Sequence, residues 1–293
     1  MQIESLKVFC DLVESESFTK AAQINHVTQS AVSQTISALE RIFKSLLVER
    51  SKKQFRLTRE GQVVYDCSQQ ILQTYASLDN KLHELKDVIS GSIRLATIYT
   101  IGLHDLPPYI KQFMKSYPTM NMHVEYRHAS QVYEDVLSNI VDLGLVAYPV
   151  KTSKLEIVPL RNDPLVLICH PQHPFAKLKG IKLKQLADQK MIGFTLIDPT
   201  RKALDKLFRQ NGLAVQYASE FDNVETMKRA VEIDGGVAIV PGVTVKQEVG
   251  KKSLAAVEIE GGRLFRPLAA IYKKDRVLSP GMKAFLEVLK GAG

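Results

Sequence analysis

The chain has 293 residues, 45% of them hydrophobic and 24% charged, which excludes a disordered or collagen-like protein and predicts two or three globular domains. Three separated cysteines, a charged N-terminus and no apolar stretch of the roughly 18–20 residues of a membrane span predict a cytoplasmic protein in a reducing compartment. The net charge of +8 comes entirely from residues 91–293, because residues 1–90 hold equal numbers of acidic and basic residues, so bulk charge gives no argument for nucleic-acid binding by the N-terminus.

Three short amphipathic helices are predicted at the N-terminus. Apolar residues three and four apart predict helices over about 3–14, 18–25 and 29–42, with Ser17 as N-cap of the second. A tight turn at residues 25–28 joins the last two helices, so together they form a helix-turn-helix. The third helix should bury Ala31, Val32, Ile36, Leu39 and Ile42.

The opposite face of the third helix is polar. Short polar side chains on a surface helix often only keep it soluble, but the second helix of such a pair enters the major groove and binds phosphates and base edges. Strands at about 46–50 and 55–58 flank a basic turn, the pattern of a wing, and Glu49 is the only acid between residues 41 and 59. We therefore expect DNA contacts from Ser17, Thr19, Thr28, Gln29, Ser30, Ser33, Gln34, Arg50, Lys52, Lys53 and Arg56.

This N-terminal stretch resembles the DNA-binding domain of the LysR-type transcriptional regulators. The resemblance rests on Phe9, Val13, Ser17–Ala22, Val27–Ser33, Ile36, Leu39, Glu40, Leu47–Arg50 and Leu57–Gly61. The family usually has Pro where Ser30 stands and Arg where Gln34 stands, so the resemblance implies DNA binding but leaves open which bases are read.

A long helix is predicted over residues 58–89, which contain no Pro and only Gly61 near the start. Apolar residues follow heptad spacing from Val64 to Ile89, so the helix should pair with another along its length, although packing on its own chain's core is the alternative. In the family resembled, this is the dimerisation helix. The expected seam consists of Ile71, Tyr75, Leu78, Leu82, Leu85 and Ile89.

Beyond a hinge at residues 90–92, short apolar strands alternate with helices, which predicts an α/β fold with a mostly parallel sheet. The expected strands are 93–98, 122–127, 143–147, 165–169, 191–194, 216–220, 237–240 and 267–272. The expected helices are 103–117, 131–140, 200–211, 223–233, 242–249 and 280–290. The resemblance implies a sensing domain of two subdomains, like periplasmic solute-binding proteins.

The predicted domains follow from these elements. They are a winged helix-turn-helix at 1–58, a linker helix at 59–90 and an effector-binding domain at 91–293, with subdomain I at 92–162 and 267–293 and subdomain II at 163–266.

Common catalytic and cofactor motifs are missing from the sequence. It contains no GxGxxG, GxxxxGK[ST], HExxH or GxSxG, so we expect no catalytic residues and no cofactor. The Cys169–Pro174 segment holds a thiol and two imidazoles, but two prolines make it a stiff turn and a fourth metal ligand is not evident, so no metal is expected. Residues 235–242 fit a ligand loop and a buried strand equally well.

Residues after two strands of the C-terminal region indicate a ligand site. Thr100 and Gly102 precede one predicted helix, and Thr195 and Arg201 lie around the start of another; free N–H groups, hydroxyls and Arg bind anions. The resemblance implies that both stretches face a cleft, with His128 and Tyr148 at its sides. We expect a carboxylate or phosphate effector at Thr100, Gly102, His128, Tyr148, Thr195 and Arg201, while scattered surface lysines remain the other explanation of the charge surplus.

The sequence thus predicts a LysR-type regulator that binds a double-stranded DNA operator as a homodimer or dimer of dimers, responds to a small effector and has RNA polymerase as a possible partner. Two alternatives are an α/β enzyme tethered to DNA by its N-terminal domain and an architectural DNA-binding protein without sequence preference.

Overall fold

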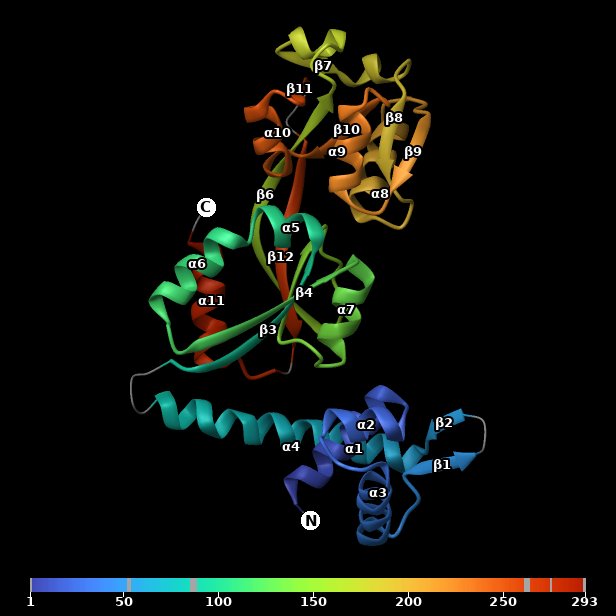
Figure 1. The fold of residues 1–293 in the computed structure, drawn as a ribbon, viewed down its shortest axis with the longest axis vertical. Coiled ribbons are helices and arrows are strands. Elements are labelled where there is room, and N and C mark those ends of the chain that lie inside the picture. Colours follow the sequence, from blue (N-terminus) through green and yellow to red (C-terminus); the bar gives the residue numbers. More distant parts are fainter. Residues whose placement is uncertain (1, 52–53, 85–88, 261–263, 275, 292–293) are drawn as a thin grey trace. The chain divides into compact units, whose positions relative to one another are not determined.

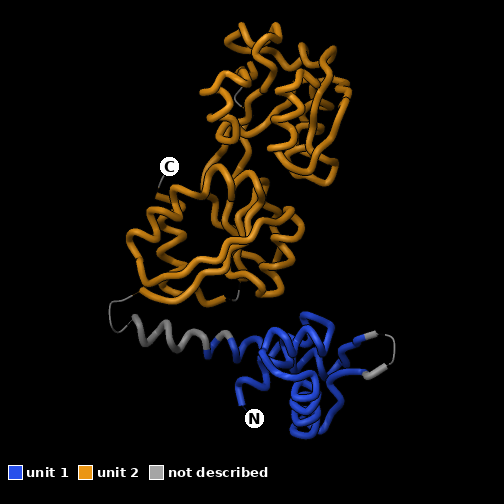
Figure 2. Tube along the Cα trace, viewed as in Figure 1, with its two compact units in different colours: residues 1–88 blue, residues 89–293 orange. Residues whose placement is uncertain are grey.

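The computed structural model describes residues 2–51, 54–84, 89–260, 264–274 and 276–291. The chain divides into two compact units, residues 1–88 and 89–293, each of which is described by itself (Figure 2). Among the helices so described, none combines the length and the apolar character that a membrane crossing requires.

Unit 1 is a small helical domain with a two-stranded ribbon and a long last helix (Figure 1). Its elements are α1 (Ile3–Ser15), α2 (Phe18–Ile24), α3 (Gln29–Phe43), β1 (Val48–Ser51), β2 (Gln54–Leu57) and α4 (Arg59–Glu84). The predicted helix-turn-helix and wing are confirmed, and Phe9, Leu12, Val32, Ile36 and Leu39 lie in one core. Ala31 is only half-buried and Ile42 is 52% exposed, so their predicted burial is wrong; α3 packs through a narrower stripe than its pattern suggests.

The long predicted helix is described over Arg59–Glu84 as α4. Leu85 lies outside the described residues, as do the side chains of Leu78 and Leu82. Ile89 is not helical: it packs against the core of unit 2, and its carbonyl accepts a hydrogen bond from the Thr119 hydroxyl at 2.7 Å. Its predicted place in the helical seam is therefore wrong.

Unit 2 is an α/β domain around a mixed sheet. The strands are β3 (Gly91–Ile98), β4 (Met120–Arg127), β5 (Leu143–Ala147), β6 (Leu155–Cys169), β7 (Gly180–Lys182), β8 (Met191–Phe194), β9 (Tyr217–Phe221), β10 (Val237–Pro241), β11 (Ala255–Glu260) and β12 (Phe265–Lys273). The helices are α5 (Tyr99–His104), α6 (Pro107–Ser116), α7 (Ala129–Leu137), α8 (Pro199–Gln210), α9 (Val224–Glu232), α10 (Lys246–Lys251) and α11 (Pro280–Lys290), with short 3₁₀ turns η1 (Pro174–Lys177), η2 (Leu183–Leu186) and η3 (Gly242–Val245).

Three predictions for unit 2 are corrected. The helix expected at 103–117 is two helices, because Pro107 and Pro108 cannot continue α5 and instead start α6. The strand expected at 165–169 is only the end of the 15-residue β6, and the helix expected at 242–249 divides into η3 and α10. The short strands β7 and β11 were not predicted.

Strand β6 runs through both halves of the sheet, whose order is β4-β3-β5-β12-β6-β10-β8-β9 (Figure 1). Residues 155–164 of β6 pair with β12, and residues 165–169 pair with β10 and β11. Separate hydrophobic cores form on each side of this switch, one around β3, β5 and β12 and the other around β8 and β10. We name these halves subdomain I and subdomain II.

Candidate functional site

The polar face of α3 is exposed over its first two turns. Gln29, Ser30 and Gln34 are exposed and Ser33 is half-buried. The Thr28 hydroxyl caps the helix by accepting from the Ala31 N–H at 3.2 Å, and it shares a 2.9 Å hydrogen bond with the Ser30 hydroxyl. The helix therefore presents amide and hydroxyl groups at a fixed N-terminus, as base-edge and phosphate contacts require.

The turn before α3 is held by hydrogen bonds. The Asn25 amide donates to the Asp11 carboxylate at 2.7 Å and to the Ala21 carbonyl at 2.9 Å, and His26 adopts the left-handed conformation that the turn needs, with φ of 54°. Ser17 caps α2 through the Lys20 N–H, and Thr19 is exposed beside it. These bonds fix α3 relative to α1 and α2.

The wing is anchored at its base. Glu40 of α3 accepts hydrogen bonds from the Leu47 and Val48 N–H groups at 3.0 and 3.4 Å, where β1 begins. Thr58 donates to the Leu46 carbonyl at 2.7 Å and caps α4 through the Gly61 N–H. Among the predicted DNA contacts of the wing, Arg56 is exposed, whereas Lys52, Lys53 and the side chain of Arg50 lie outside the described residues.

Helix α4 carries an apolar groove together with the start of α1. The groove is lined by Ile3, Cys67, Gln70, Ile71, Thr74 and Tyr75. Ile71 and Tyr75, two residues of the predicted seam, are 43% and 52% exposed. The single chain thus leaves a large part of these apolar side chains uncovered.

In unit 2, Thr100 lies at the start of α5, where β3 ends. Its side chain is buried, and its hydroxyl accepts a hydrogen bond from Nη1 of Arg266 at 2.9 Å. Nη2 of Arg266 donates to the Asp163 carboxylate at 2.7 Å. Burial raises the pKa of Asp163, while the Arg266 guanidinium opposes that rise.

The other subdomain I residues surround the same strand ends. Gly102 is a packing residue, because a Cβ there would lie 2.5 Å from the Tyr126 ring. His128 is exposed at the N-cap of α7, with its ring 6.3 Å from that of Tyr99. Tyr148 follows β5 with a φ of 50°, a conformation that costs free energy for an aromatic residue, and its N–H donates to the Pro267 carbonyl.

In subdomain II the start of α8 differs from our expectation. The Asp198 carboxylate caps the helix by accepting from the Thr200 and Arg201 N–H groups at 2.7 and 3.3 Å, so these N–H groups are not free to hold an anionic ligand. Thr195 is half-buried just before this cap, and its N–H donates to the Phe221 carbonyl.

Arg201 is buried and takes part in structural contacts. Its Nε donates to the Asp205 carboxylate at 2.9 Å, and its Nη1 donates to Glu220 at 2.9 Å and to the Phe194 carbonyl at 2.7 Å. Its guanidinium also lies 3.5 Å above the Tyr217 ring. These contacts argue against the effector-binding role that we expected for Arg201.

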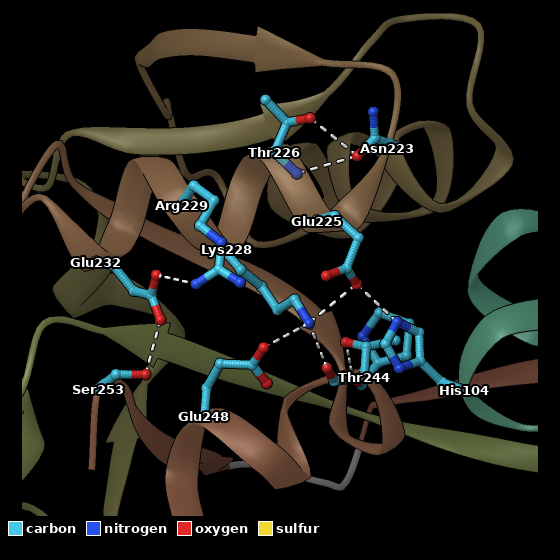
Figure 3. Close-up of polar contacts among 11 residues, drawn as sticks. His104, Asn223, Glu225, Thr226, Lys228, Arg229, Glu232, Thr244, Glu248 and Ser253 are labelled. Atoms are coloured by element: carbon cyan, nitrogen blue, oxygen red, sulfur yellow. Dashed lines mark hydrogen bonds and ion pairs between the residues drawn. The ribbon is translucent and has the colours of Figure 1, made fainter. Parts of the chain in front are cut away.

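A polar network joins the two subdomains (Figure 3). Nε2 of His104, the last residue of α5, lies 2.7 Å from the Glu225 carboxylate of α9. The same carboxylate lies 2.9 Å from the buried ammonium of Lys228, which also donates to the Glu248 carboxylate and the Thr244 carbonyl at 2.8 and 2.9 Å. Helix α5 therefore contacts Arg266 through its first turn and subdomain II through its last residue.

The sequence did not single out Arg266, Asp163, His104 or Lys228. Each is an ordinary charged residue in its local context, and Arg266, Asp163 and His104 have partners more than 100 residues away along the chain. The one available signal is that Arg266 interrupts an otherwise apolar stretch directly before Pro267.

The Cys169–Pro174 segment forms a hydrogen-bonded turn. Cys169 is buried, Nδ1 of His170 accepts from the Gln172 N–H, and His173 caps η1 and contacts Gln189. No group of three His, Cys, Asp or Glu side chains that could hold a metal ion occurs within the described ranges.

Comparison with known proteins matches both units. Residues 3–62 match the family described as bacterial regulatory helix-turn-helix protein, lysR family, and residues 86–293 match the LysR substrate binding domain. The transcriptional activator CmpR of Synechocystis is 30% identical over 287 residues, 98% of this chain and 94% of that protein.

Two solved structures share the fold. A full-length OxyR from Pseudomonas aeruginosa superposes with a TM-score of 0.80 at 20% identity, covering 99% of this chain and 94% of that one. The effector-binding domain of QuiR, in complex with shikimate, superposes with a TM-score of 0.64 at 24% identity, covering 70% of this chain and 98% of that domain.

Proposed function

The chain belongs to the LysR family of transcriptional regulators, and we propose that it binds a partly palindromic operator whose affinity or bending responds to a small anionic effector. The family assignment makes it a DNA-binding transcriptional regulator with an effector-binding domain. The alternative of a DNA-tethered enzyme finds no support, because the matched relatives are regulators.

The observation that carries the operator proposal is the exposed N-terminal face of α3. Gln29, Ser30, Ser33 and Gln34 extend from a helix whose start is capped by Thr28 and whose entry turn is fixed by hydrogen bonds. Arg56, with Arg50, Lys52 and Lys53, would contact flanking phosphates from the wing. Ser17 and Thr28, both cap residues, and the exposed Thr19 would contribute hydroxyls at the helix ends.

We propose that the chain acts as a homodimer or dimer of dimers. The apolar groove between α1 and α4 leaves Ile71 and Tyr75 exposed, and the heptad pattern continues through Leu78, Leu82 and Leu85. A second copy of α4 would cover this surface. A two-fold dimer would also match a palindromic operator.

We propose that the effector lies between the two subdomains, with Thr100, Tyr148 and Thr195 as its principal contacts. Gly102 allows the close packing of α5, and His128 stands at the edge of the same strand ends. The shikimate bound to the QuiR domain is the kind of small carboxylate that such a site would take. The protein would act in the cytoplasm, with RNA polymerase as a possible partner.

Footprinting on the DNA that flanks the chain's own coding region tests the operator proposal. We expect protection of a partly palindromic site, and Gln29→Ala should weaken operator binding by about 1–3 kcal/mol while leaving random DNA unaffected. Gln2→Ala is the matched control, because it makes the same change at an exposed residue before α1 whose side chain forms no cap hydrogen bond. Equal losses on operator and random DNA for Gln29→Ala would refute the assignment of α3 as the reading helix.

A further inference from the structure

Arg266 is one of the largest fully buried side chains of the molecule, with 1% of its surface exposed. It stands directly across from Asp163 in the register of β12 and β6. Two residues later, at Leu165, β6 begins to pair with β10 of subdomain II. The Arg266–Asp163 ion pair therefore sits where the sheet passes from one subdomain to the other.

Only the two terminal nitrogens of the Arg266 guanidinium have hydrogen-bond partners among the described residues. Nη2 donates to Asp163 and Nη1 donates to the Thr100 hydroxyl, whereas the buried Nε has no hydrogen-bond partner among the described residues. A buried cation with an unpartnered donor is unfavourable by itself. Such an arrangement is typically kept for a reason other than stability.

The contact with Arg266 determines what the Thr100 hydroxyl can do. An arginine donates hydrogen bonds but accepts none, so the hydroxyl oxygen must be the acceptor of this bond. Its own proton then points elsewhere, and no acceptor for it occurs among the described residues. The hydroxyl therefore has its proton available for an incoming group, and only one of its two lone pairs remains to accept.

Charged and polar groups from both subdomains surround this point. Burial raises the pKa of the Tyr148 hydroxyl, and the charges of Arg266, Asp198 and Asp163 also act on it. Tyr148 lies beside the Arg266–Asp163 ion pair, because its N–H donates to the carbonyl of Pro267, the residue after Arg266, at 2.8 Å. A ligand beside Thr100 would meet one oriented hydroxyl, one phenol and the field of the buried guanidinium.

We propose that Arg266 biases the effector's chemistry: by occupying one lone pair of the Thr100 hydroxyl and turning its proton outward, it makes the site favour a carboxylate over an ammonium or amidinium group. The inference rests on the proposed effector site and adds a specificity-determining residue to it. Arg266 acts through Thr100, so it positions a contact and does not itself have to touch the ligand.

The test uses acetate and acetamidinium, two planar ions of nearly the same shape with opposite charge and opposite hydrogen-bond polarity. The full chain is labelled at threonine methyl groups, and the Thr100 resonance is followed during each titration. We expect the Thr100 methyl shift to change with acetate concentration and to level off by about 100 mM acetate. The same concentrations of acetamidinium should leave the shift unchanged. Stronger binding of acetamidinium would overturn both this inference and the anionic-effector proposal.

Two variants distinguish the role of Arg266 from the existence of the effector site. Arg266→Lys keeps the charge but loses the fork that reaches both partners, so acetate affinity should fall about tenfold or more. Arg276→Lys, in a half-buried arginine that pairs with Asp142, is the matched control and should bind acetate like the parent. Equal binding by both variants would overturn the role of Arg266 while leaving the effector site in place.

A second variant covers the case in which Arg266→Lys does not fold. Thr100→Val removes the hydroxyl without changing charge, and binding is then read at the Thr97 methyl, which packs against α5 at the position of Gly102. Acetate binding should be lost in Thr100→Val and retained in Thr100→Ser. Retention in the valine variant, or no acetate-induced shift in the parent, would overturn the inference, whereas the operator footprint would be unaffected by either result.

Discussion

The two units hold their important polar groups in opposite ways. In unit 1 they are exposed and their partners are close in sequence: Thr28 caps α3 at a residue three positions away. In unit 2 the buried Arg266 pairs with residues far along the chain, Asp163 at 103 positions and Thr100 at 166 positions. Helical periodicity therefore predicts the exposed polar face of α3, but it cannot predict which residues meet where β6 passes from subdomain I to subdomain II.

The difference also has an energetic side. When an exposed polar side chain is removed, water can hydrogen-bond to the groups it leaves behind. Such a substitution therefore changes the free energy of unfolding little. A buried ion that loses its partner retains its full desolvation penalty. Substitutions of single polar residues should therefore alter recognition in unit 1 and stability in unit 2.

Two buried thiols report on the units separately. Burial raises the pKa of Cys10 in unit 1 to about 12 and that of Cys169 in unit 2 to about 11, so both are protected from alkylation at neutral pH. With the exposed Cys67 replaced by Ser, each remaining thiol reacts only when its own unit opens. Their alkylation rates measure the local stability of each unit.

The largest expected effect is that of Lys228→Met. It removes the ammonium from between Glu225 and Glu248, leaving a buried carboxylate without its cation, so unit 2 should lose about 3–5 kcal/mol. Alkylation of Cys169 should accelerate strongly, and that of Cys10 should not change.

Arg229→Met is the control for this prediction. Arg229 is the next residue of α9 and pairs with Glu232 on the surface, so its loss should leave both thiol rates as in the parent. Similar Cys169 rates in the two variants would break the contrast between buried and exposed ion pairs.

A smaller effect is expected from backbone packing in unit 1. A Cβ at Gly61 would lie 2.1 Å from the Leu47 carbonyl oxygen and 2.8 Å from a Leu57 methyl group, so Gly61→Ala must displace α4 from the base of the wing. Overpacking of this kind costs about 1–3 kcal/mol and should speed alkylation of Cys10. Gly250→Ala, where nothing lies within 4 Å of the added Cβ, should speed neither thiol. A parental Cys10 rate in Gly61→Ala would show that this contact relaxes freely.

The sequence predicted unit 1 more completely than unit 2 for a physical reason. Helices at 3–14, 18–25 and 29–42 follow from local spacing, and the structure places their ends within two residues of these positions. In unit 2 the strand positions were recovered, but the length of β6 and the short β7 and β11 depend on pairing with distant strands. The contact of Arg201 with Glu220 was not predicted for the same reason, because it forms only once α8 and β9 pack together.

The smallest effect distinguishes two neighbouring residues of the reading helix. Thr28 was predicted as a DNA contact, and the structure gives its hydroxyl a second role as the N-cap of α3. Thr28→Ala should therefore cost unit 1 about 1 kcal/mol and raise the Cys10 alkylation rate about fivefold, whereas Thr28→Ser should keep the cap. Gln29→Ala, one residue later and fully on the exposed face, should leave the Cys10 rate unchanged while weakening operator binding. If Gln29→Ala destabilised unit 1 as much as Thr28→Ala, the separation of recognition from stability on this helix would be wrong, because an exposed side chain without a structural partner has little folding free energy to lose.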